Sequence, residues 1–450
     1  MSVCSIHELA TKIVGCAGLF ELRGASNAVV VRDGAVSRSI MPREECLLMP
    51  FSSLGLSPSL LRAVADCAFV VPTPVQAASI PPALQGRDIL GSAQTGSGKT
   101  VAFALPLLQR LTARNTQRSR RPQALVLVPT RELAAQVGDT IRILAKHLPM
   151  APKIAIVFGG VSINPQMMSL RGGADIVVAT PGRVLDLVDH NALALGGVTM
   201  LVLDEADRLL DLGFAEELER IIGMLPKDRQ SQFFSATFPV DVQLLAQRLL
   251  RDPVRIEVRA DSQNELDIEQ RAIAVDAGRR AGLLCKLIQQ HDWSRVLVFV
   301  ATKRATEHVA DKLRKAQIDA EAFSGELSQG KRTQVLADFK ASRLRVLVAT
   351  DIAARGLDIS QLPVVVNFDL PRSSLDYTHR IGRTGRAGES GLAVSFVSAE
   401  SEAHFHLIEK RHHLKLEIER IEGFEPREVA PVAPGRSPSQ SPASNRGVKG

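Results

Sequence analysis

Aromatic side chains are scarce in this sequence of 450 residues. They make up 4% of it, with one Trp and one Tyr. Modules that recognise single-stranded nucleic acid by stacking its bases need exposed aromatic rings. The scarcity argues against a base-stacking module, so a nucleic-acid partner would be held through its phosphates and sugars.

Paired cysteines and long apolar runs are also missing. The five cysteines include no CxxC pair, so the sequence suggests neither a zinc site nor a disulfide framework, and it fits a reducing cytosol. The longest apolar runs have about the length of a strand, so we expect no transmembrane helix. The first residues lack the basic region and apolar core of a secretory signal.

The composition that is present is that of a soluble globular protein, with 45% hydrophobic and 23% charged residues. The length allows two or three domains. Lys and Arg exceed Asp and Glu by 55 − 48 = +7, which permits an anionic partner such as nucleic acid without demanding one.

A phosphate-binding loop is the first motif with chemical content. Residues 93–100, AQTGSGKT, lie between an apolar strand candidate at 88–91 and a helical pattern at 101–105. Gly96 and Gly98 allow successive N–H groups to point at a phosphate. Lys99 would reach the β- and γ-phosphates, and the Thr100 hydroxyl would bind Mg²⁺. Because Ala93 stands where the strict pattern has Gly, a glycine-rich turn at a helix start is the alternative.

A second motif follows an apolar strand candidate at 198–203. Carboxylates at the end of such a strand lie where a parallel sheet places its ligands. Asp204 is therefore a candidate partner of Mg²⁺, and the neighbouring Glu205 a candidate to polarise the attacking water. The alternative is a helix N-cap followed by acidic residues of the first turn.

Residues 1–50 differ in pattern from the rest of the chain. Helical spacing of apolar residues occurs within the first twenty, at Ile6, Leu9, Ile13, Ala17 and Phe20. We expect a poorly ordered extension here, or a true translation start at Met49. From Phe51 to residue 252 we expect the first domain, because strand candidates alternate with helical patterns, which predicts a parallel sheet covered by helices. The strand candidates are 124–128, 153–158, 175–179, 198–203 and 232–235.

A polar stretch with Pro253 predicts an interdomain linker at 253–268. The alternation restarts in a second domain at 269–426, with strand candidates at 296–300, 345–349, 364–368 and 393–397. It has no Lys-bearing phosphate loop, which suggests that nucleotide is held in a cleft between the domains. Residues 427–450 are rich in Pro, Ser, Gly and Arg and predict a disordered basic tail.

The second half has two charged segments of interest. Arg383 and Arg386 would share a face of one helical turn, where they could act on a γ-phosphate as arginine fingers; the alternative is a solvated basic helix. The stretch from Thr350 to Asp358 follows an apolar strand candidate. Asp358 could accept from a ribose hydroxyl and Arg355 could meet a phosphate, whereas a capped helix start with a surface salt bridge is the alternative.

From Phe51 to Pro426 the chain resembles the DEAD-box family of ATP-dependent RNA helicases, and within it the bacterial RhlE-type group is the most similar. Residues 93–100 match the family's phosphate loop, including its initial Ala, and residues 204–207 match the motif that names the family. The fold that this resemblance implies is α/β, with two RecA-like parallel-sheet domains of the P-loop NTPase class joined by a short linker.

The resemblance also implies roles at the nucleotide site, with ATP and Mg²⁺ as the cofactors. Phe69 would stack on adenine, and Gln76 would bond the adenine edge. The cofactor-binding residues would be Phe69, Gln76, Ala93, Gln94, Thr95, Gly96, Ser97, Gly98, Lys99, Thr100 and Asp358, with Thr100 and Asp204 as metal ligands. The catalytic residues would be Lys99, Asp204, Glu205, Ser235, Thr237, His379, Arg383 and Arg386.

RNA contacts would be made to phosphates and 2′-hydroxyls. In the first half they would come from Pro129, Thr130, Arg131, Gly159, Gly160, Thr180, Pro181, Gly182 and Arg183, and in the second from Gln329, Arg332, Thr350 and Arg355. The sequence departs from the family at Ala68, where Gly is usual, and at Ser324, where His is common. Neither position is catalytic, so we expect altered tuning with activity retained.

The implied function is an ATP-dependent helicase that binds RNA through its backbone with low sequence specificity and locally unwinds short duplexes. An ATP-gated RNA clamp with incidental unwinding is the alternative, and a DNA translocase is a further one. We expect a cytoplasmic monomer that does not bind membranes. Ribosome-assembly and RNA-degradation machinery are the candidate partners.

Overall fold

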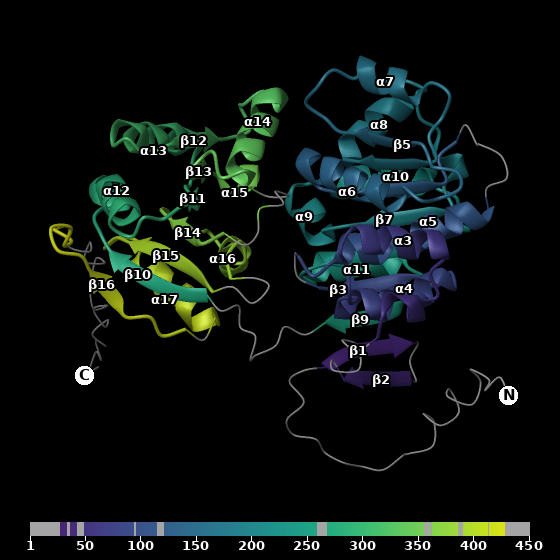
Figure 1. The fold of residues 1–450 in the computed structure, drawn as a ribbon, viewed down its shortest axis with the longest axis horizontal. Helices are drawn as coiled ribbons and strands as arrows, with labels where there is room; N and C mark the ends of the chain where they lie inside the picture. The colour runs from purple at the N-terminus through teal and green to yellow at the C-terminus, as the bar shows by residue number, and fades with distance from the viewer. Residues whose placement is uncertain are drawn as a thin grey trace, which may run out of the picture. The chain divides into compact units, whose positions relative to one another are not determined.

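The computed structural model of the chain describes residues 28–33, 37–42, 49–93, 96–114, 121–258, 268–354, 359, 362–385, 390–412 and 414–427. The chain forms two compact units, each built around one β-sheet, and their main division along the chain lies after residue 263 (Figure 1). The two sheets confirm the prediction of an α/β protein with two parallel-sheet domains.

The sheet of the first unit is parallel from β9 to β5 and has an antiparallel hairpin at one edge. All six strand candidates of the first half lie in it, as β3 to β8. In spatial order its strands are β2 (Ser37–Pro42), β1 (Ala28–Asp33), β9 (Val254–Val258), β3 (Ile89–Ser92), β8 (Gln230–Ser235), β7 (Met200–Leu203), β4 (Ala124–Leu127), β6 (Ile176–Ala179) and β5 (Ile154–Val157).

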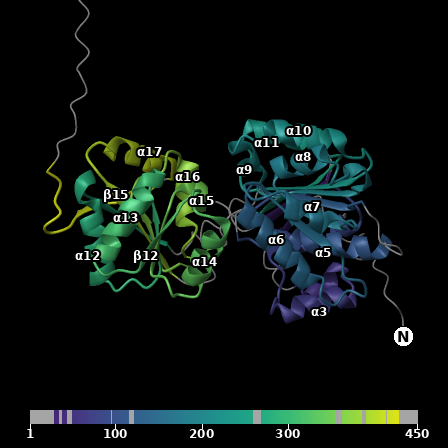
Figure 2. The ribbon, with the colours of Figure 1, turned by 90° about the horizontal axis from the view of Figure 1, so that it is seen from above.

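Helices cover both faces of this sheet, with α5 and α6 on one face and α8, α10 and α11 on the other (Figure 2). Strands β4, β6 and β7 are buried along their whole length, as expected for parallel strands between two helical layers. The helices are α3 (Pro58–Asp66), α4 (Pro74–Leu84), α5 (Lys99–Arg114), α6 (Arg131–Leu144), α7 (Asn164–Leu170), α8 (Pro181–Asp189), α9 (Ala206–Asp211), α10 (Ala215–Met224) and α11 (Val240–Leu249), with short 3₁₀ turns at Phe51–Leu54 and Leu195–Gly197.

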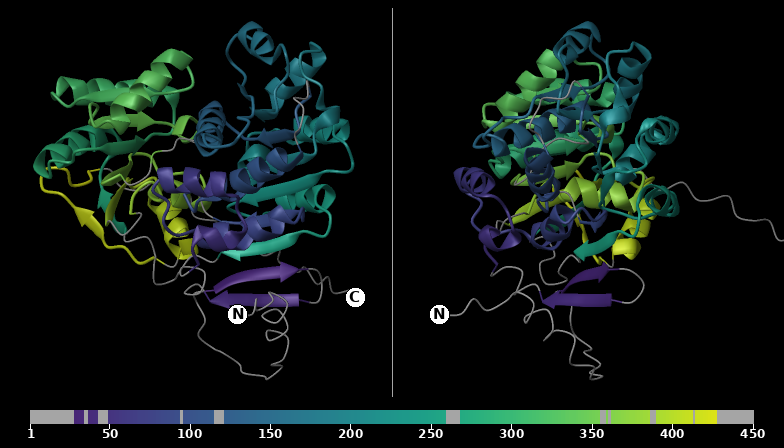
Figure 3. Two further views of the ribbon diagram at one scale, coloured as in Figure 1. Left: turned by 45° about the vertical axis from the view of Figure 1, so that its right-hand side comes forward. Right: turned by 90° about the vertical axis from the view of Figure 1, so that its right-hand side faces the viewer.

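The N-terminal extension differs from the expectation of poor order. Strands β1 and β2 form a hairpin, and β1 pairs antiparallel with β9 from Val29 opposite Val258 to Arg32 opposite Arg255 (Figure 3). The run of three valines at 29–31 suits a strand, and the free edge of β9 offers it backbone partners. Residues 1–27 and 43–48 lie outside the described part of the chain.

The expected linker at 253–268 is also partly wrong. Residues 254–258 form β9, which pairs with β3 on one side and β1 on the other. Val254 and Ile256 are buried, whereas Arg255 between them is exposed, so the period-two pattern of a strand was present beside Pro253. Residue 268 opens β10, and residues 259–267 lie outside the described ranges.

The sheet of the second unit is parallel throughout its described strands. Strands β10, β12 and β16 were missed, since their short or charged sequences give a weak apolar signal. In spatial order the strands are β12 (Ala320–Phe323), β13 (Val346–Ala349), β11 (Val296–Phe299), β14 (Val364–Asn367), β15 (Gly391–Val397), β10 (Ile268–Ala274) and β16 (Ile418–Arg420).

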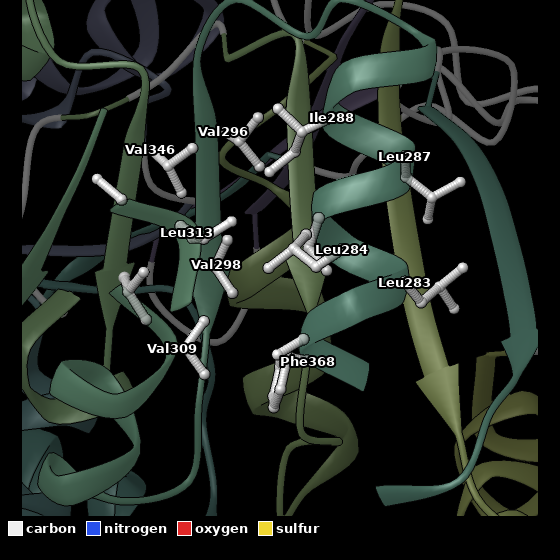
Figure 4. Packing of buried hydrophobic residues seen from close by; sticks show 14 of the residues in the cluster. Leu283, Leu284, Leu287, Ile288, Val296, Val298, Val309, Leu313, Val346 and Phe368 are labelled. Atoms are coloured by element: carbon white, nitrogen blue, oxygen red, sulfur yellow. The ribbon is translucent and has the colours of Figure 1, made fainter. Parts of the chain in front are cut away.

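Alternating residues of the central strands enter separate cores. Val296 and Val298 of β11 pack with α12 and α13 (Figure 4). Leu297 and Phe299 pack with α14 and α15. Burial on both faces explains the continuous apolar runs in the sequence. The helices are α12 (Arg280–Gln290), α13 (Lys303–Lys315), α14 (Gln329–Lys340), α15 (Asp351–Ala354), α16 (Ser374–Ile381) and α17 (Glu402–His412), with a 3₁₀ turn at Ala277–Arg279.

The helices of the described ranges include none that combines the length and the apolar character needed to cross a membrane.

Candidate nucleotide and RNA sites

Most predicted site residues of the first unit lie at or follow the carboxyl ends of its parallel strands. Strands β3, β8 and β7 are neighbours, and the phosphate loop, residues 235–237 and the acidic residues lie at their ends, whereas Phe69 and Gln76 precede β3. Strands β4, β6 and β5 are the next three, and the candidate RNA residues follow them. Strand order therefore separates the two groups of residues along one edge of one sheet.

The phosphate-loop candidate joins β3 to α5. Gly96 and Gly98 have φ values of 80° and 91°, which explains why glycine is required there. Lys99 is buried, and its Nζ donates to the Ala93 carbonyl oxygen at 2.9 Å, across the turn. The loop thus closes on itself and places the Lys99 amine at the start of a sixteen-residue helix. Gln94 and Thr95 lie outside the described residues.

Helix α4 is tied to this loop through Gln76. The Gln76 Oε1 accepts from the Thr73 backbone N–H at 2.9 Å, and its Nε2 donates to the Gly98 carbonyl at 3.1 Å. A Cβ on Gly98 would clash with that Nε2, so the glycine is required for this approach as well. Phe69, the predicted adenine-stacking residue, keeps 42% of its surface exposed.

An acidic cluster lies at the end of β7. Asp204 is buried and accepts from the Glu205 backbone N–H at 2.9 Å. Glu205 itself has φ 51° and ψ 52°, a left-handed conformation that is strained for a residue with a side chain. Burial raises the pKa of Asp204 to about 6; the nearby Lys99 charge opposes this rise, and the Glu205 charge adds to it. The Glu205 carboxylate lies 3.3 Å from the buried Arg208 guanidinium.

Asp207 connects this cluster to the end of β8. Its Oδ2 accepts from the Thr237 backbone N–H at 2.9 Å and from the Thr237 hydroxyl at 2.8 Å. The Asp207 N–H donates to the Ser235 Oγ at 3.2 Å, and that hydroxyl donates to the Thr237 carbonyl at 2.7 Å. The sequence predicted Ser235 and Thr237 but not Asp207, although Asp207 belongs to the quoted motif.

The donor set fits a hard divalent cation. Asp204 is a desolvated carboxylate that is mainly ionised at neutral pH, and Thr100 lies one residue after Lys99 in the first turn of α5. Mg²⁺ prefers one or two carboxylate or hydroxyl ligands, with water and phosphate oxygens completing the shell. The described residues hold no cluster of three or more His, Cys, Asp or Glu side chains that would bind a metal alone.

The candidate RNA residues beside β4 and β5 start α6 and form a tight turn. The Thr130 Oγ1 accepts from the Leu133 N–H at 3.2 Å, and the Arg131 guanidinium approaches the Gly160 carbonyl at 3.5 Å. Gly160 has φ 74°, and a Cβ there would clash with the Arg131 guanidinium. This glycine is therefore required by the fold of the loop itself.

The fold of the loops does not in this way require glycine at Gly159 and Gly182. A Cβ on Gly159 or on Gly182 would meet no described atom within 4 Å, and neither residue has a positive φ. Gly182 lies in the first turn of α8, which begins at Pro181 after the N-cap Thr180. Arg183 is buried and bonds Asp186 at 3.3 Å. Open space beside these two glycines allows a ligand to approach the backbone closely.

In the second unit, the best-organised polar group is one the sequence analysis missed. Arg380 is 2% exposed and donates to both carboxylate oxygens of Asp351, at 2.6 and 2.7 Å. It also donates to Asn367 Oδ1 at 3.1 Å and to the Asp369 carbonyl at 2.6 Å. Its guanidinium lies 4.9 Å from the centre of the Phe299 ring. Arg380 thus joins α16 to the residues that follow β13 and β14.

The predicted residues of this unit lie around that group. Thr350 caps α15, with its Oγ1 accepting from the Ala353 N–H at 3.3 Å. His379 and Arg383 flank Arg380 along the chain, and Arg383 is buried. A Cβ on Gly391 would overlap the backbone of Gly385, so glycine is required for the Arg383 loop to lie against β15. Arg355, Asp358 and Arg386 lie outside the described residues.

Gln329 and Arg332 lie on the first turn of α14. Arg332 is buried, donates to the Ser324 carbonyl at 2.8 Å and lies 4.3 Å over the Phe323 ring. Ser324, the position where the family commonly has His, therefore supports Arg332 through its backbone. The Gln329 Oε1 is buried without a hydrogen-bond partner among the described residues.

Comparison with protein families gives two matches in chain order. Residues 73–245 match the DEAD/DEAH box helicase model, and residues 279–388 match the helicase conserved C-terminal domain. The two matches fall on the first and second sheets respectively.

Individual relatives extend over most of the chain. It is 41% identical over 367 residues to the DEAD-box ATP-dependent RNA helicase CshA of Bacillus cereus, covering 82% of this chain and 69% of that one. It is 45% identical over 360 residues to the ATP-dependent RNA helicase SrmB of Escherichia coli, covering 80% of each. Among solved structures, S. cerevisiae Dbp5 bound to RNA and ADP BeF3 is similar, with a TM-score of 0.73 and 30% identity over 83% of this chain and 95% of that one.

Proposed function

The chain belongs to the DEAD-box family of ATP-dependent RNA helicases, and from this premise we propose how its own residues divide the work. It is an RNA-dependent ATPase and helicase with two RecA-like domains. The observation that carries the proposal is the grouping of Lys99, Asp204 and the Asp207–Thr237 bonds on three neighbouring strands of one sheet.

In this proposal the first unit holds the nucleotide. The N–H groups of the loop and the Lys99 amine bind the β- and γ-phosphates, after Lys99 leaves the Ala93 carbonyl. Gln76 and Phe69 hold the adenine, supported by the bond from Gln76 to the loop. Thr100 and Asp204 would hold Mg²⁺, which when bound neutralises charge on the phosphate oxygens.

Glu205 orients the attacking water and accepts its proton. The proposal rests on the position of Glu205, which is held beside Asp204 in a strained backbone conformation and beside the Arg208 cation. Strain of this kind is retained where the surrounding structure fixes a functional side chain. A shift in the position of this cluster would move the Ser235–Thr237 loop, because Asp207 accepts two hydrogen bonds from Thr237.

The second unit supplies positive charge. Arg383 and Arg386 would stabilise the charge that develops on the γ-phosphate in the transition state. Asp358 would contact the ribose, and His379 would couple the arginines to the RNA-binding residues. Support comes from the buried Arg380 network, which fixes the helix that carries His379 and leads to Arg383.

RNA would be bound through its backbone by the residues after β4, β5 and β6, and by Gln329, Arg332, Thr350 and Arg355. The open space beside Gly159 and Gly182 supports close approach of a phosphate. A net charge of +7 suits a polyanion. We propose further that the protein is a cytoplasmic monomer that unwinds short duplexes in ribosome assembly or RNA degradation.

The test is steady-state ATP hydrolysis with single-stranded RNA, with single-stranded DNA and without nucleic acid. We expect strong stimulation by RNA, none by DNA, and a low rate alone. Equal stimulation by DNA would indicate a DNA translocase. Slow hydrolysis together with long-lived retention of RNA would indicate a clamp, and a rate indifferent to RNA would overturn the RNA assignments.

A further inference from the structure

A cavity of about 700 Å³ lies in the first unit between α11 and the sheet edge formed by β3 and β9. Its lining is mixed: apolar side chains such as Leu90, Phe238 and Leu250 lie beside polar and charged ones such as Gln247 and Arg255. Its volume lies within the range of sites that hold ligands or several side chains. The residues proposed above for ATP and RNA, apart from Thr237, take no part in its lining.

The cavity follows from how the edge of the sheet is covered. Along β3 and β9, Ile89 and Ile256 point to one face and are fully buried. The alternate residues Leu90 and Arg255 point to the other face and line the cavity. On this face α11 buries Val242, Ala246 and Leu249 and leaves the space beside the edge strands unfilled.

Two catalytic loops border the cavity. Ser92, the last residue of β3 before the phosphate loop, lines it, and so does Thr237. The Thr237 hydroxyl bonds Asp207 at 2.8 Å. A group that reaches the Thr237 side of the cavity therefore contacts the loop after β8, whose Thr237 bonds the acidic cluster.

Strand β1 begins beside the same cavity. Val29 of β1 pairs with Val258 of β9, and Val258 lines the cavity. Phe20 precedes Ala28 by eight positions, which an extended chain spans in at most about 26–29 Å. The apolar stripe of Ile6, Leu9, Ile13, Ala17 and Phe20 is thus tethered beside a cavity whose lining includes Leu90, Phe238 and Leu250.

We propose that residues 1–27 place this stripe in the cavity and restrain the Ser235–Thr237 loop, which lowers ATP hydrolysis in the absence of RNA. The tether gives the segment a high effective concentration at the site, which favours it over a free ligand. The docking of residues 1–27 is argued from the cavity and from the pairing of β1 with β9. The effect on ATP hydrolysis also rests on the function proposed above.

A photo-cross-linking experiment on the full-length chain tests the docking directly. A benzophenone amino acid replaces the exposed, cavity-lining Gln247, and the cross-linked peptides are mapped by mass spectrometry. The control places the same probe at the exposed Lys227, next to the start of β8 and away from the carboxyl ends of the strands. We expect cross-links from position 247 to residues 1–27 of the same chain, and none from position 227.

Two double variants then separate the stripe from the segment as a whole. Leu9→Asp with Ile13→Asp charges the stripe, whereas Thr11→Asp with Lys12→Asp adds as many carboxylates off the stripe. The first pair should abolish the cross-link and raise RNA-free hydrolysis severalfold, and the second should leave both unchanged. Because the cross-link is read without ATP, its result is independent of whether the chain hydrolyses ATP as proposed.

Three results would overturn the inference. Cross-links confined to residues near the probe would show that the segment does not occupy the cavity, and cross-links between two chains would give the site to a second copy. Loss of the cross-link in both double variants would remove the role of the stripe. A cross-link lost in the first variant with no change in hydrolysis would refute the regulatory part alone.

Discussion

The two sheets bury different sets of charged side chains at the carboxyl ends of their strands. The first unit buries three carboxylates there, at Asp204, Glu205 and Asp207, together with Lys99 and Arg208. The second unit buries Arg380 and Arg383. The scaffold is the same parallel sheet between helices, so the residues that follow each strand decide which charged groups are buried.

The two edges also differ in how far they neutralise their own charge. Arg380 makes four hydrogen bonds, two of them to the oxygens of Asp351. Among the described residues, Asp204 accepts from one backbone N–H and lies near Lys99, and its pKa is raised to about 6 by burial. A buried carboxylate with few partners favours a cation as a ligand, whereas a paired arginine favours a fixed position. We therefore expect Asp204 to bind a cation and Arg380 to hold α16 in place.

The largest change in activity should come from a substitution in the acidic cluster at the end of β7. Glu205→Gln keeps the size of the side chain but removes the proton acceptor, so kcat should fall by about 10²–10⁴. Steady-state hydrolysis with saturating RNA measures it. Glu216→Gln, at an exposed position of α10, is the matched control and should keep full activity. Retained kcat in the Glu205 variant would remove this residue from the chemistry.

A substitution of the buried Arg380 should lower the free energy of unfolding of the second unit. Arg380→Lys keeps the charge but cannot reproduce the paired bonds to Asp351, and a buried acceptor left without its hydrogen bond costs about 1–3 kcal/mol. Urea unfolding followed by the fluorescence of Trp293, the sole Trp, reports on the second unit, where this residue is buried. Arg343→Lys, whose bonds to Asp338 are exposed, should have a much smaller effect. Equal shifts in the two variants would mean that the Arg380 network does not stabilise the unit.

The carboxylate of Asp204 should also set a lower pH limit for ATP hydrolysis. The pKa of Asp204 is about 6, above its ordinary value, so the carboxylate is mostly ionised at pH 7 and becomes protonated as the pH falls through 6. We expect kcat/KM for MgATP to fall by about tenfold per pH unit below that value, because the protonated acid cannot hold Mg²⁺. Higher Mg²⁺ concentration should move the fall to lower pH. A flat profile between pH 7 and 5 would contradict this role of Asp204.

The smallest effect is expected on thermal stability, at Ala68, where the sequence departs from the family. This residue precedes the adenine-stacking candidate. Ala68 has φ 56°, a conformation that costs an L-residue about 1–2 kcal/mol and a glycine little. Ala68→Gly should therefore raise the thermal unfolding midpoint. Ala65→Gly, on the exposed side of α3, should lower it, since glycine weakens a helix interior. A loss of stability in both variants would show that Ala68 is not strained.

Much of this arrangement was predictable from local sequence. The strands β4 to β8 and the loop at 93–100 were found because apolar runs, glycines and charges alternate there in the order a parallel sheet requires. The hairpin of β1 and β2 was missed because the chain before Met49 was expected to be poorly ordered, and β9 was missed because it pairs with strands distant in the chain. The polar composition at 253–268 predicted a linker, and the alternation of buried and exposed residues at 254–256 was too short to outweigh that prediction.

The Arg380 network was missed for a related reason. Asp351, Asn367 and Asp369 lie after or at the ends of different strands, and only the sheet brings them to one arginine. The sequence drew attention to the neighbouring His379 and Arg383, while Arg380 gave no separate signal of burial. Asp207, by contrast, stood in a recognised motif, and its bonds to Thr237 needed the register of β7 and β8 to be seen.

The central claim is that the first unit binds the nucleotide and the second supplies charge for its hydrolysis. Arg383→Ala separates the two when the affinity for a fluorescent ATP analogue is measured without RNA and single-turnover hydrolysis is measured with it. We predict that the affinity changes by no more than about twofold and that hydrolysis falls by about 10³ or more. Loss of affinity in proportion to the loss of hydrolysis, or unchanged hydrolysis, would contradict this division.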